Sequence, residues 1–433
     1  MAPDLDGDLG VDVLIIGGGI QGLYIAREVA KTYSVCVVAD PTVAAATLES
    51  SGYLSPGYDG NDANRIQPAR RAAGWWRLWA ENQGLGSLDE APLYVVGLDE
   101  HESRTRLWAD AMLPVVPADS LPELFAGGNL SGSSRFRAEA DLVLDPGAVL
   151  TALRSGIESR CLTGEIVRFG LSPDDVIDHV QVQVGADVVP VVPRFVILAA
   201  GVGNAGLLTQ FGSRLADQAR RKAAKELADH CQAVRSQHQI CVRGRDLPRV
   251  DGHFGSLTIA SHIAESGERV WVVEPPVDDD RTTEGPDNLR FERPVDSAVV
   301  AGAVAQLFAM APDLRGRAPD LQWSVYVARR TQHPSLAGPD ATAVAQPVPA
   351  KLETFGLGTF VAVWPSHLAY AQFVGDAVAE RVAAALGPAE DFGPVAEPAE
   401  FGPPLVPLRS RWDTDAFAWH EWLAFVATHG IAI

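Results

Sequence analysis

The sequence contains few basic residues. Lysine and arginine together number 35 against 55 aspartates and glutamates, which gives a formal net charge of −20. The only lysines are Lys31, Lys222, Lys225 and Lys351. A protein this acidic repels phosphate backbones and anionic membrane surfaces, so the composition argues against nucleic-acid binding.

Cysteines and long apolar runs are also scarce. The four cysteines, at positions 36, 161, 231 and 241, have no C-x-x-C spacing, so we expect neither a metal site nor a disulfide framework. No apolar run reaches 18 residues, which argues against a membrane span. Residues 1–10 are acidic and do not resemble a signal peptide, so we expect a cytoplasmic protein. With 433 residues the chain exceeds one ordinary core, and two domains are expected.

The strongest motif lies near the N-terminus. Residues 11–16 form an apolar run that predicts a buried parallel strand, and residues 17–22 (GGGIQG) then fit G-x-G-x-x-G. An apolar stripe predicts a helix over 20–31, and a second strand over 35–38 ends at Asp40, 23 positions after Gly17. This order of strand, glycine loop, helix, strand and acid is typical of dinucleotide-binding folds.

Each position of the motif has a physical role in such a fold. Gly17 permits the tight turn, Gly19 lets the backbone approach a diphosphate, and Gly22 allows close packing of helix on strand. The free N–H groups of the helix N-terminus attract the phosphates. Asp40 is suited to accept hydrogen bonds from the adenosine ribose. FAD and NAD share this pattern, and a doubly wound fold without a ligand is the plainer alternative.

Four later segments favour a flavin. The Ser/Gly-rich residues 49–57 follow Asp40, residues 144–150 read LDPGAVL, residues 195–204 end a buried strand with AAG, and residues 326–331 read YVARRT. With the glycine motif, they resemble the D-amino-acid oxidase and glycine oxidase superfamily, which includes sarcosine oxidases and FAD-linked glycerol-3-phosphate dehydrogenases. The similarity covers roughly residues 11–386.

The resemblance implies an α/β fold in which a Rossmann-like FAD-binding domain is interleaved with a mostly antiparallel β-sheet substrate domain. The expected FAD domain comprises 1–90, 145–215 and 335–390; the substrate domain, 91–144 and 216–334; and 391–433 form a Pro-rich tail with a helix over 415–429. Residues 41–74 are expected to be loop, followed by a Trp-bearing helix over 74–83. Asp145-Pro146-Gly147 predicts a helix start, and further helices are expected over 214–235 and 296–310. Alternating residues in 164–169 and 180–184 predict strands of a small sheet.

The resemblance also implies the cofactor and its contacts. FAD is expected to be bound without a covalent bond, because no cysteine follows Cys241. Relatives place a Gly-rich loop beside the flavin where this chain has WPSHLA over residues 364–369. The expected cofactor-binding residues are Gly17, Gly19, Ile20, Gln21, Gly22, Asp40, Ser51, Gly52, Val167, Ala200, Gly201, Pro365, Ser366, His367 and Leu368.

Candidate catalytic residues are few. Arg329 is expected at the end of a strand over 321–328, where relatives present an arginine to a substrate carboxylate, and Arg330 would face the other way. Each arginine could instead pair with surface acids. His367 and Tyr370 follow the last strand and would face the flavin ring, although His367 could also be a packed residue.

The activity implied is oxidation of a small amine or amino acid by hydride transfer to flavin, with oxygen or another electron acceptor as oxidant. A homodimer is one assembly that the resemblance allows. Alternatives are a flavin dehydrogenase of a hydroxy acid or polyol phosphate, a non-enzymatic flavin-binding protein and an NAD-dependent enzyme. Gly375-Asp376-Ala377 resembles a motif of flavin hydroxylases, but it falls inside a predicted helix over 371–386 rather than after a strand.

Overall fold

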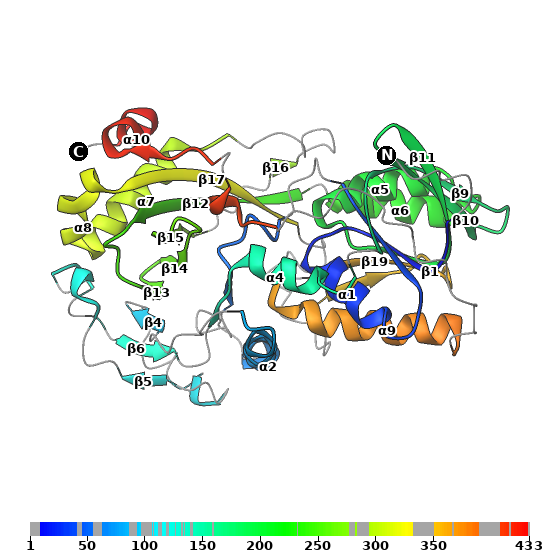
Figure 1. Ribbon diagram of the computed structural model, residues 1–433, viewed down its shortest axis with the longest axis horizontal. Helices are drawn as coiled ribbons and strands as arrows, with labels where there is room; N and C mark the ends of the chain where they lie inside the picture. The colour runs from blue at the N-terminus through cyan, green and yellow to red at the C-terminus, as the bar shows by residue number, and fades with distance from the viewer. Residues whose placement is uncertain are drawn as a thin grey trace.

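A computed structural model shows two β-sheets lying side by side, with helices on their outer faces (Figure 1). It describes residues 9–40, 46–54, 63–85, 93–96, 106, 108–110, 115–117, 121–125, 127–130, 133, 135–138, 142–157, 160–231, 233–276, 282–283, 294–331, 350–365, 368–388, 408–414 and 417–431.

The first sheet has eight strands among the described residues. Its main path runs β18 (Ala350–Glu353), β19 (Phe360–Pro365), β11 (Asp187–Leu198), β1 (Leu9–Ile16), β2 (Val35–Ala39) and β8 (Cys161–Thr163), parallel from β19 to β8. β9 (Glu165–Leu171) and β10 (Ile177–Val184) extend β11 as an antiparallel ribbon. The expected separate small sheet is therefore wrong, because β11 is long enough to pair with β10 through one half and with β1 through the other.

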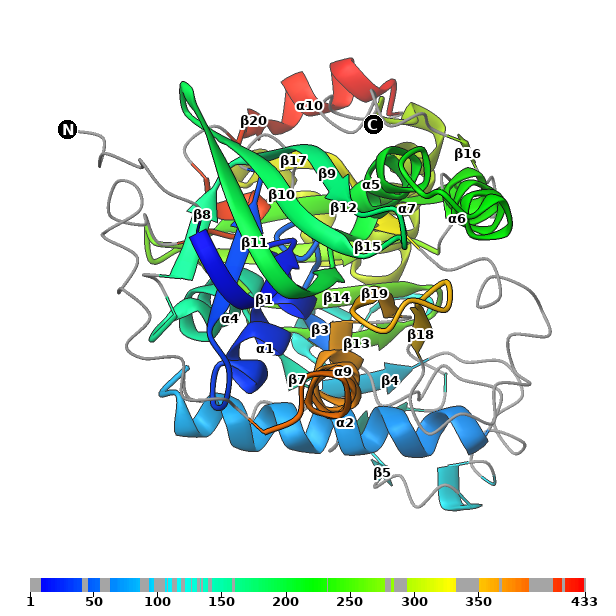
Figure 2. The ribbon, with the colours of Figure 1, turned by 90° about the vertical axis from the view of Figure 1, so that its right-hand side faces the viewer.

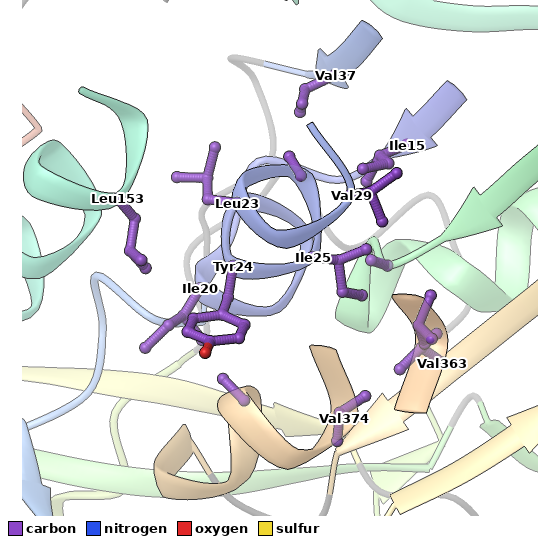
Figure 3. Packing of buried hydrophobic residues seen from close by; sticks show 14 of the residues in the cluster. Ile15, Ile20, Leu23, Tyr24, Ile25, Val29, Val37, Leu153, Val363 and Val374 are labelled. Atoms are coloured by element: carbon purple, nitrogen blue, oxygen red, sulfur yellow. The ribbon is translucent and has the colours of Figure 1, made fainter. Parts of the chain in front are cut away.

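Helices cover both faces of this sheet. α1 (Ile20–Val29), α2 (Ala63–Asn82), α4 (Pro146–Arg154) and α9 (Ala371–Leu386) pack on one face, and α5 (Asn204–Gly212) and α6 (Gln218–Cys231) on the other. Figure 3 shows α1 enclosed by Leu153 of α4 and by Val363 and Val374. α4 begins as predicted: the Asp145 carboxylate accepts hydrogen bonds from Gly147 N and Ala148 N.

The predicted loop before residue 74 is wrong in part. α2 begins at Ala63, contains Pro68 and crosses the molecule as one long helix (Figure 2). Burial explains the length: Trp76 and Trp79 are 0% and 9% exposed and pack edge-to-face on each other. This packing outweighs the poor helix propensity of the earlier residues.

The second sheet has ten strands within the described ranges and is antiparallel except where β13 meets β4. Its order is β20 (His420–Glu421), β17 (Gln322–Thr331), β12 (Ala233–Gly244), β15 (Arg269–Glu274), β14 (Leu257–Ile263), β13 (Asp251–Phe254), β4 (Leu93–Val96), β6 (Arg135–Ala138) and β5 (Val115–Pro117), with β16 (Thr282–Thr283) beside β12. α7 (Ser297–Met310), α8 (Pro312–Arg317) and α10 (Trp422–His429) cover one face. β3 (Tyr53–Leu54) and β7 (Leu142–Val143) form a separate pair.

Two predicted helix boundaries in this part are also wrong. α6 ends at Cys231 rather than 235, because β12 begins at Ala233 and pairs with β17 along its whole length. α10 begins at Trp422 rather than 415; Phe417 lies before it and packs on Tyr326 instead. The expected Pro-rich tail lies outside the described residues as far as residue 407.

The fold is therefore mixed α/β with parallel and antiparallel sheets, and the two sheets draw on alternating stretches of the chain. The exact domain boundaries stay a prediction. In the described part no single helix is both long and apolar enough to cross a membrane. Only the bent pair Ser297–Met310 and Pro312–Asp320 has the length and composition of a membrane span when its two helices are taken together. The first helix of this pair, α7, is packed on the second sheet.

Candidate functional site

Two positions of the glycine motif between β1 and α1, Gly17 and Gly22, can only be occupied by glycine. Gly17 donates its N–H to Val38 O at 2.8 Å and has φ +129°, and a Cβ there would lie 2.3 Å from Ala199 O. A Cβ on Gly22 would lie 1.8 Å from Gly17 O. Side chains at either position would collide with backbone, so these glycines bring α1 against the ends of β1 and β11.

Gly19 occupies a different environment. It caps α1 without a side-chain hydrogen bond, and among the described residues a Cβ there would meet only Thr47 Oγ1, at 3.4 Å. Ile20 N donates to the same Thr47 hydroxyl at 3.2 Å. No acidic residue lies in the first turn, so the helix N-terminus keeps its partial positive charge for an anion. Thr47 was not predicted from the sequence as a site residue. Its position between Asp40 and the Ser/Gly-rich segment was the signal that could have indicated it.

The segment from Thr47 to Leu54, here called the cofactor loop, is held by the second sheet at alternate residues. Tyr326 Oη donates to Glu49 O at 3.0 Å, His262 Nε2 lies 2.7 Å from Ser51 O, and the rings of His253 and Tyr53 meet edge-to-face with centres 5.0 Å apart. Three strands of one sheet therefore contact this loop. The sequence analysis singled out Ser51 and Gly52 but not the residues that hold them.

The stability of the protein is expected to depend on pH through His262. A carbonyl can only accept, so His262 donates to Ser51 O from Nε2, and burial lowers the pKa of His262 below its ordinary value. Because the pKa is lower in the folded state, the unfolded chain takes up a proton at His262 more readily than the folded chain does. The stability that neutral His262 contributes is therefore present above about pH 6.5 and is lost as the pH falls below that value. We expect chemical unfolding to require less denaturant at pH 5 than at pH 7.

His262→Gln keeps a donor but cannot titrate, so it should flatten part of this pH dependence. His429→Gln, at the half-exposed end of α10, is the matched control and should flatten it less. An unchanged pH dependence in His262→Gln would contradict the assignment.

A C-terminal segment also contacts the cofactor loop and the residues that hold it. Ser410 Oγ donates to Asp145 Oδ1 at 2.6 Å, and Arg411 N donates to Leu48 O at 2.8 Å. The Trp412 ring stacks on His262, with centres 4.7 Å apart. Residues distant in sequence thus fix both ends of the loop.

Asn204 joins the ends of two parallel strands next to the glycine loop. Its amide oxygen accepts from Ala200 N at 2.9 Å, and its amide nitrogen donates to Val363 O at 3.0 Å. The side chain is fully buried. Ala200 and Gly201, both expected at the cofactor, are therefore held beside Gly17, whose Cβ position lies 2.7 Å from Ala200 N.

We expect Asn204→Ala to destabilise the protein by about 1–3 kcal/mol for each polar group left without a partner. The measurement is the midpoint of chemical unfolding. Asn82→Ala, at the exposed end of α2, is the control and should cost under about 0.5 kcal/mol. Equal stability of the two variants would show that the bridge does not hold the strand ends.

The start of α9 brings further polar groups to this region. Leu368–Tyr370 form a short 3-10 turn whose Ala369 O accepts from Trp76 Nε1 at 2.8 Å. Gln372 is 2% exposed, and neither atom of its amide has a hydrogen-bond partner among the described residues. Tyr370 is half-buried at the N-cap of α9. Pro365 ends β19, whereas Ser366 and His367 lie outside the described residues.

Arg329 does not lie at a strand end as expected. β17 continues to Thr331, and Arg329 is 4% exposed within it. Its N–H donates to Glu49 Oε2 at 2.9 Å, and its Nη1 lies 3.6 Å from Glu49 Oε1. The carboxylate of the cofactor loop therefore already neutralises this guanidinium. The backbone of Arg330 continues β17, but its side chain lies outside the described part.

The FAD dependent oxidoreductase family, DAO, matches residues 12–362. The chain belongs to this family. It is therefore an FAD-dependent oxidoreductase, which settles the choice between FAD and NAD left open by the glycine motif. No curated protein sequence matches the chain.

Solved structures of related enzymes share the fold at low sequence identity. An FAD-dependent oxidoreductase from Pseudomonas aeruginosa is 21% identical, with a TM-score of 0.61 over 89% of this chain and 93% of that one. Glycine oxidase from Geobacillus kaustophilus is 15% identical, with a TM-score of 0.60 over 86% and 94%. L-amino acid deaminase from Proteus vulgaris is 13% identical, with a TM-score of 0.62 over 92% and 97%.

The residues present fit the FAD of the family. The N-terminus of α1 has room for phosphate at Gly19, and Asp40 directly follows β2. The amide of Gln372, without a protein partner, adds a donor and an acceptor at the start of α9. Val167 lies in β9, is 44% exposed, and its carbonyl accepts from Gln210 Nε2 at 2.8 Å. Its role at the cofactor stays a prediction.

Proposed function

We propose that this member of the family oxidises a small amine or amino acid by transfer of hydride from a substrate C–H bond to FAD. The observation that carries the proposal is the contact between the second sheet and the cofactor loop, which brings buried polar side chains of that sheet to the loop. Related structures include proteins named glycine oxidase and iminodiacetate oxidase.

The chain's own residues would hold the cofactor without a covalent bond. The α1 N-terminus and Thr47 would bind the diphosphate, and Asp40 the ribose. Three of the cysteines, Cys36, Cys161 and Cys241, are buried and form no disulfide within the described residues. Burial raises the thiol pKa of Cys36 and Cys241, which disfavours the reactive thiolate.

The bound FAD supplies the hydride acceptor, so the protein mainly needs to orient the substrate and exclude water. The amine must be neutral when it reacts. A buried, partly apolar site favours the neutral form because burial disfavours charge.

The rival activity, dehydrogenation of a hydroxy acid or polyol phosphate, requires an anion-binding group for the substrate. Arg329 was the candidate, and Glu49 neutralises it. For Arg329 to orient a carboxylate, the substrate would have to displace Glu49. The amine therefore remains the better-supported substrate class.

The deciding experiment is an anaerobic screen of the purified holoprotein. Amines, amino acids, hydroxy acids and polyol phosphates are added singly, and loss of the yellow flavin colour is recorded. We expect amines to bleach the flavin, with free FAD as the unreactive control. Bleaching only by hydroxy acids or polyol phosphates would refute the amine proposal and favour its rival. Oxygen and artificial acceptors are then compared as oxidants.

A further inference from the structure

A continuous row of polar side chains crosses the face of the second sheet that is turned away from α7. Cross-strand pairing aligns Tyr326 with Gln239, Glu274 with Thr258, and Thr258 with His253. Gln239 Nε2 joins the two halves by donating to Glu274 Oε1 at 2.6 Å. Both ends of the row contact the cofactor loop, through Tyr326 and His253.

The orientation of the row follows from strand alternation. On β12, Ile240 and Val242 pack in the cluster that contains α7 residues. Successive side chains on a strand point to opposite faces, so Gln237 and Gln239 point away from α7. Cys241 confirms the pattern, because it packs with Tyr326 in a different cluster.

Gln239 of the row and Gln237, two residues earlier on the same face of β12, each carry a hydrogen-bond acceptor without a donor among the described residues. Gln237 Oε1 and Gln239 Oε1 have no partner within the described ranges, although the two side chains are only 5% and 0% exposed. Native proteins rarely leave buried acceptors unsatisfied, because each costs free energy. Together with the Glu274 carboxylate they form an acceptor set that suits a group with several N–H donors and a positive charge.

A carboxylate such as that of Glu274 would hinder oxidation of an amine nitrogen placed next to it. An adjacent negative charge keeps an amine protonated, and a protonated amine has no lone pair to assist hydride loss from its carbon. The bound ammonium must therefore be a second nitrogen of the substrate. The nearby Arg329 offers no competing attraction for a substrate anion, since Glu49 neutralises it.

We propose that Gln237, Gln239 and Glu274 bind a second, cationic nitrogen of the substrate, so that this enzyme acts on diamines rather than on simple amino acids. The inference rests on the proposed amine oxidation and narrows its substrate class. Glu274 supplies the charge, and the two glutamine oxygens accept hydrogen bonds from the ammonium.

The test is isothermal titration calorimetry on the FAD-loaded protein without oxygen, with diaminobutane and butylamine as probes. We expect the wild type to bind diaminobutane at least about tenfold more tightly than butylamine, in line with one or two added hydrogen bonds to a charged group. Glu274→Gln and Gln237→Leu should each remove most of that preference and leave butylamine binding unchanged. Glu226→Gln, a surface acid on α6, is the charge-matched control.

Gln237→Leu is included because Glu274→Gln could change the fold as well as the site. It replaces an unsatisfied oxygen by an apolar group and should leave the fold intact. Equal binding of the two probes by the wild type, or an unchanged preference in both variants, overturns the proposal. Flavin reduction by the same probes is recorded separately. If the diamine binds at this site but does not reduce the flavin, the proposed amine oxidation is refuted and the binding site is retained. If butylamine reduces the flavin and the protein shows no preference for the diamine, the binding site is refuted and the proposed amine oxidation is retained.

Discussion

The Gly19→Val protein is expected to fold and yet to be purified colourless. The backbone tolerates a side chain, since φ at Gly19 is −77° and, in the part of the chain that the structure describes, only Thr47 Oγ1 lies within 4 Å of the Cβ position. The branched side chain would instead fill the space next to the N–H groups of α1, where the diphosphate of FAD is expected. Losing about two hydrogen bonds to a charged group should weaken FAD binding roughly a hundredfold or more.

The measurement is the FAD content of the purified protein, followed by fluorescence titration of the apoprotein with FAD. Gly74→Ala is the matched control, because a Cβ at that position of α2 meets nothing within 4 Å, and this variant should stay yellow. Normal FAD affinity in Gly19→Val would mean that the diphosphate does not bind at this helix terminus.

Arg329→Met is expected to lower the free energy of unfolding by about 3 kcal/mol, near the lower end for breaking a buried ion pair. Both side chains are buried, with Arg329 4% and Glu49 8% exposed, so the substitution leaves a carboxylate with little access to water. The backbone N–H at position 329 still donates to Glu49, which moderates the loss. Because the guanidinium is already neutralised, the effect on kcat/KM for amines should be smaller than the effect on stability.

The double variant Glu49→Gln/Arg329→Met should recover more than half of the lost stability, because it removes the stranded charge. Lys222→Met breaks the exposed pair between Lys222 and Glu226 on α6 and should cost under about 1 kcal/mol. If Arg329→Met is as stable as the wild type but loses most activity on a carboxylate-bearing substrate, Arg329 anchors the substrate and the amino-acid interpretation is restored.

The sequence predicted what local patterns determine. The glycine loop, the helix start at Asp145 and the helix from Ala371 to Leu386 all follow from spacing over a few residues, and the structure contains each of them. The helix expected over 296–310 is another local prediction that the structure confirms, with Asp296 as its N-cap. Such features depend on neighbours in the chain, which a sequence displays directly.

The missed features depend on partners far apart in sequence. Glu49 and Arg329 are 280 positions apart, and the sequence around either residue does not indicate that the two residues pair. The early start of α2 depends on tryptophan burial against other elements rather than on its own composition. The row through Gln239 and Glu274 becomes visible only when the register of neighbouring strands is known.

The bracing of the cofactor loop has a consequence for the order in which the protein can mature. Ribosomes add the loop and the glycine motif long before Arg411, which donates to Leu48 of the loop, and Trp412, which stacks on the His262 ring that contacts Ser51. A nascent chain without these two residues would therefore hold the loop less firmly. We expect tight FAD binding only once both residues have been added and have folded onto their partners, and FAD would then stabilise the folded chain by mass action.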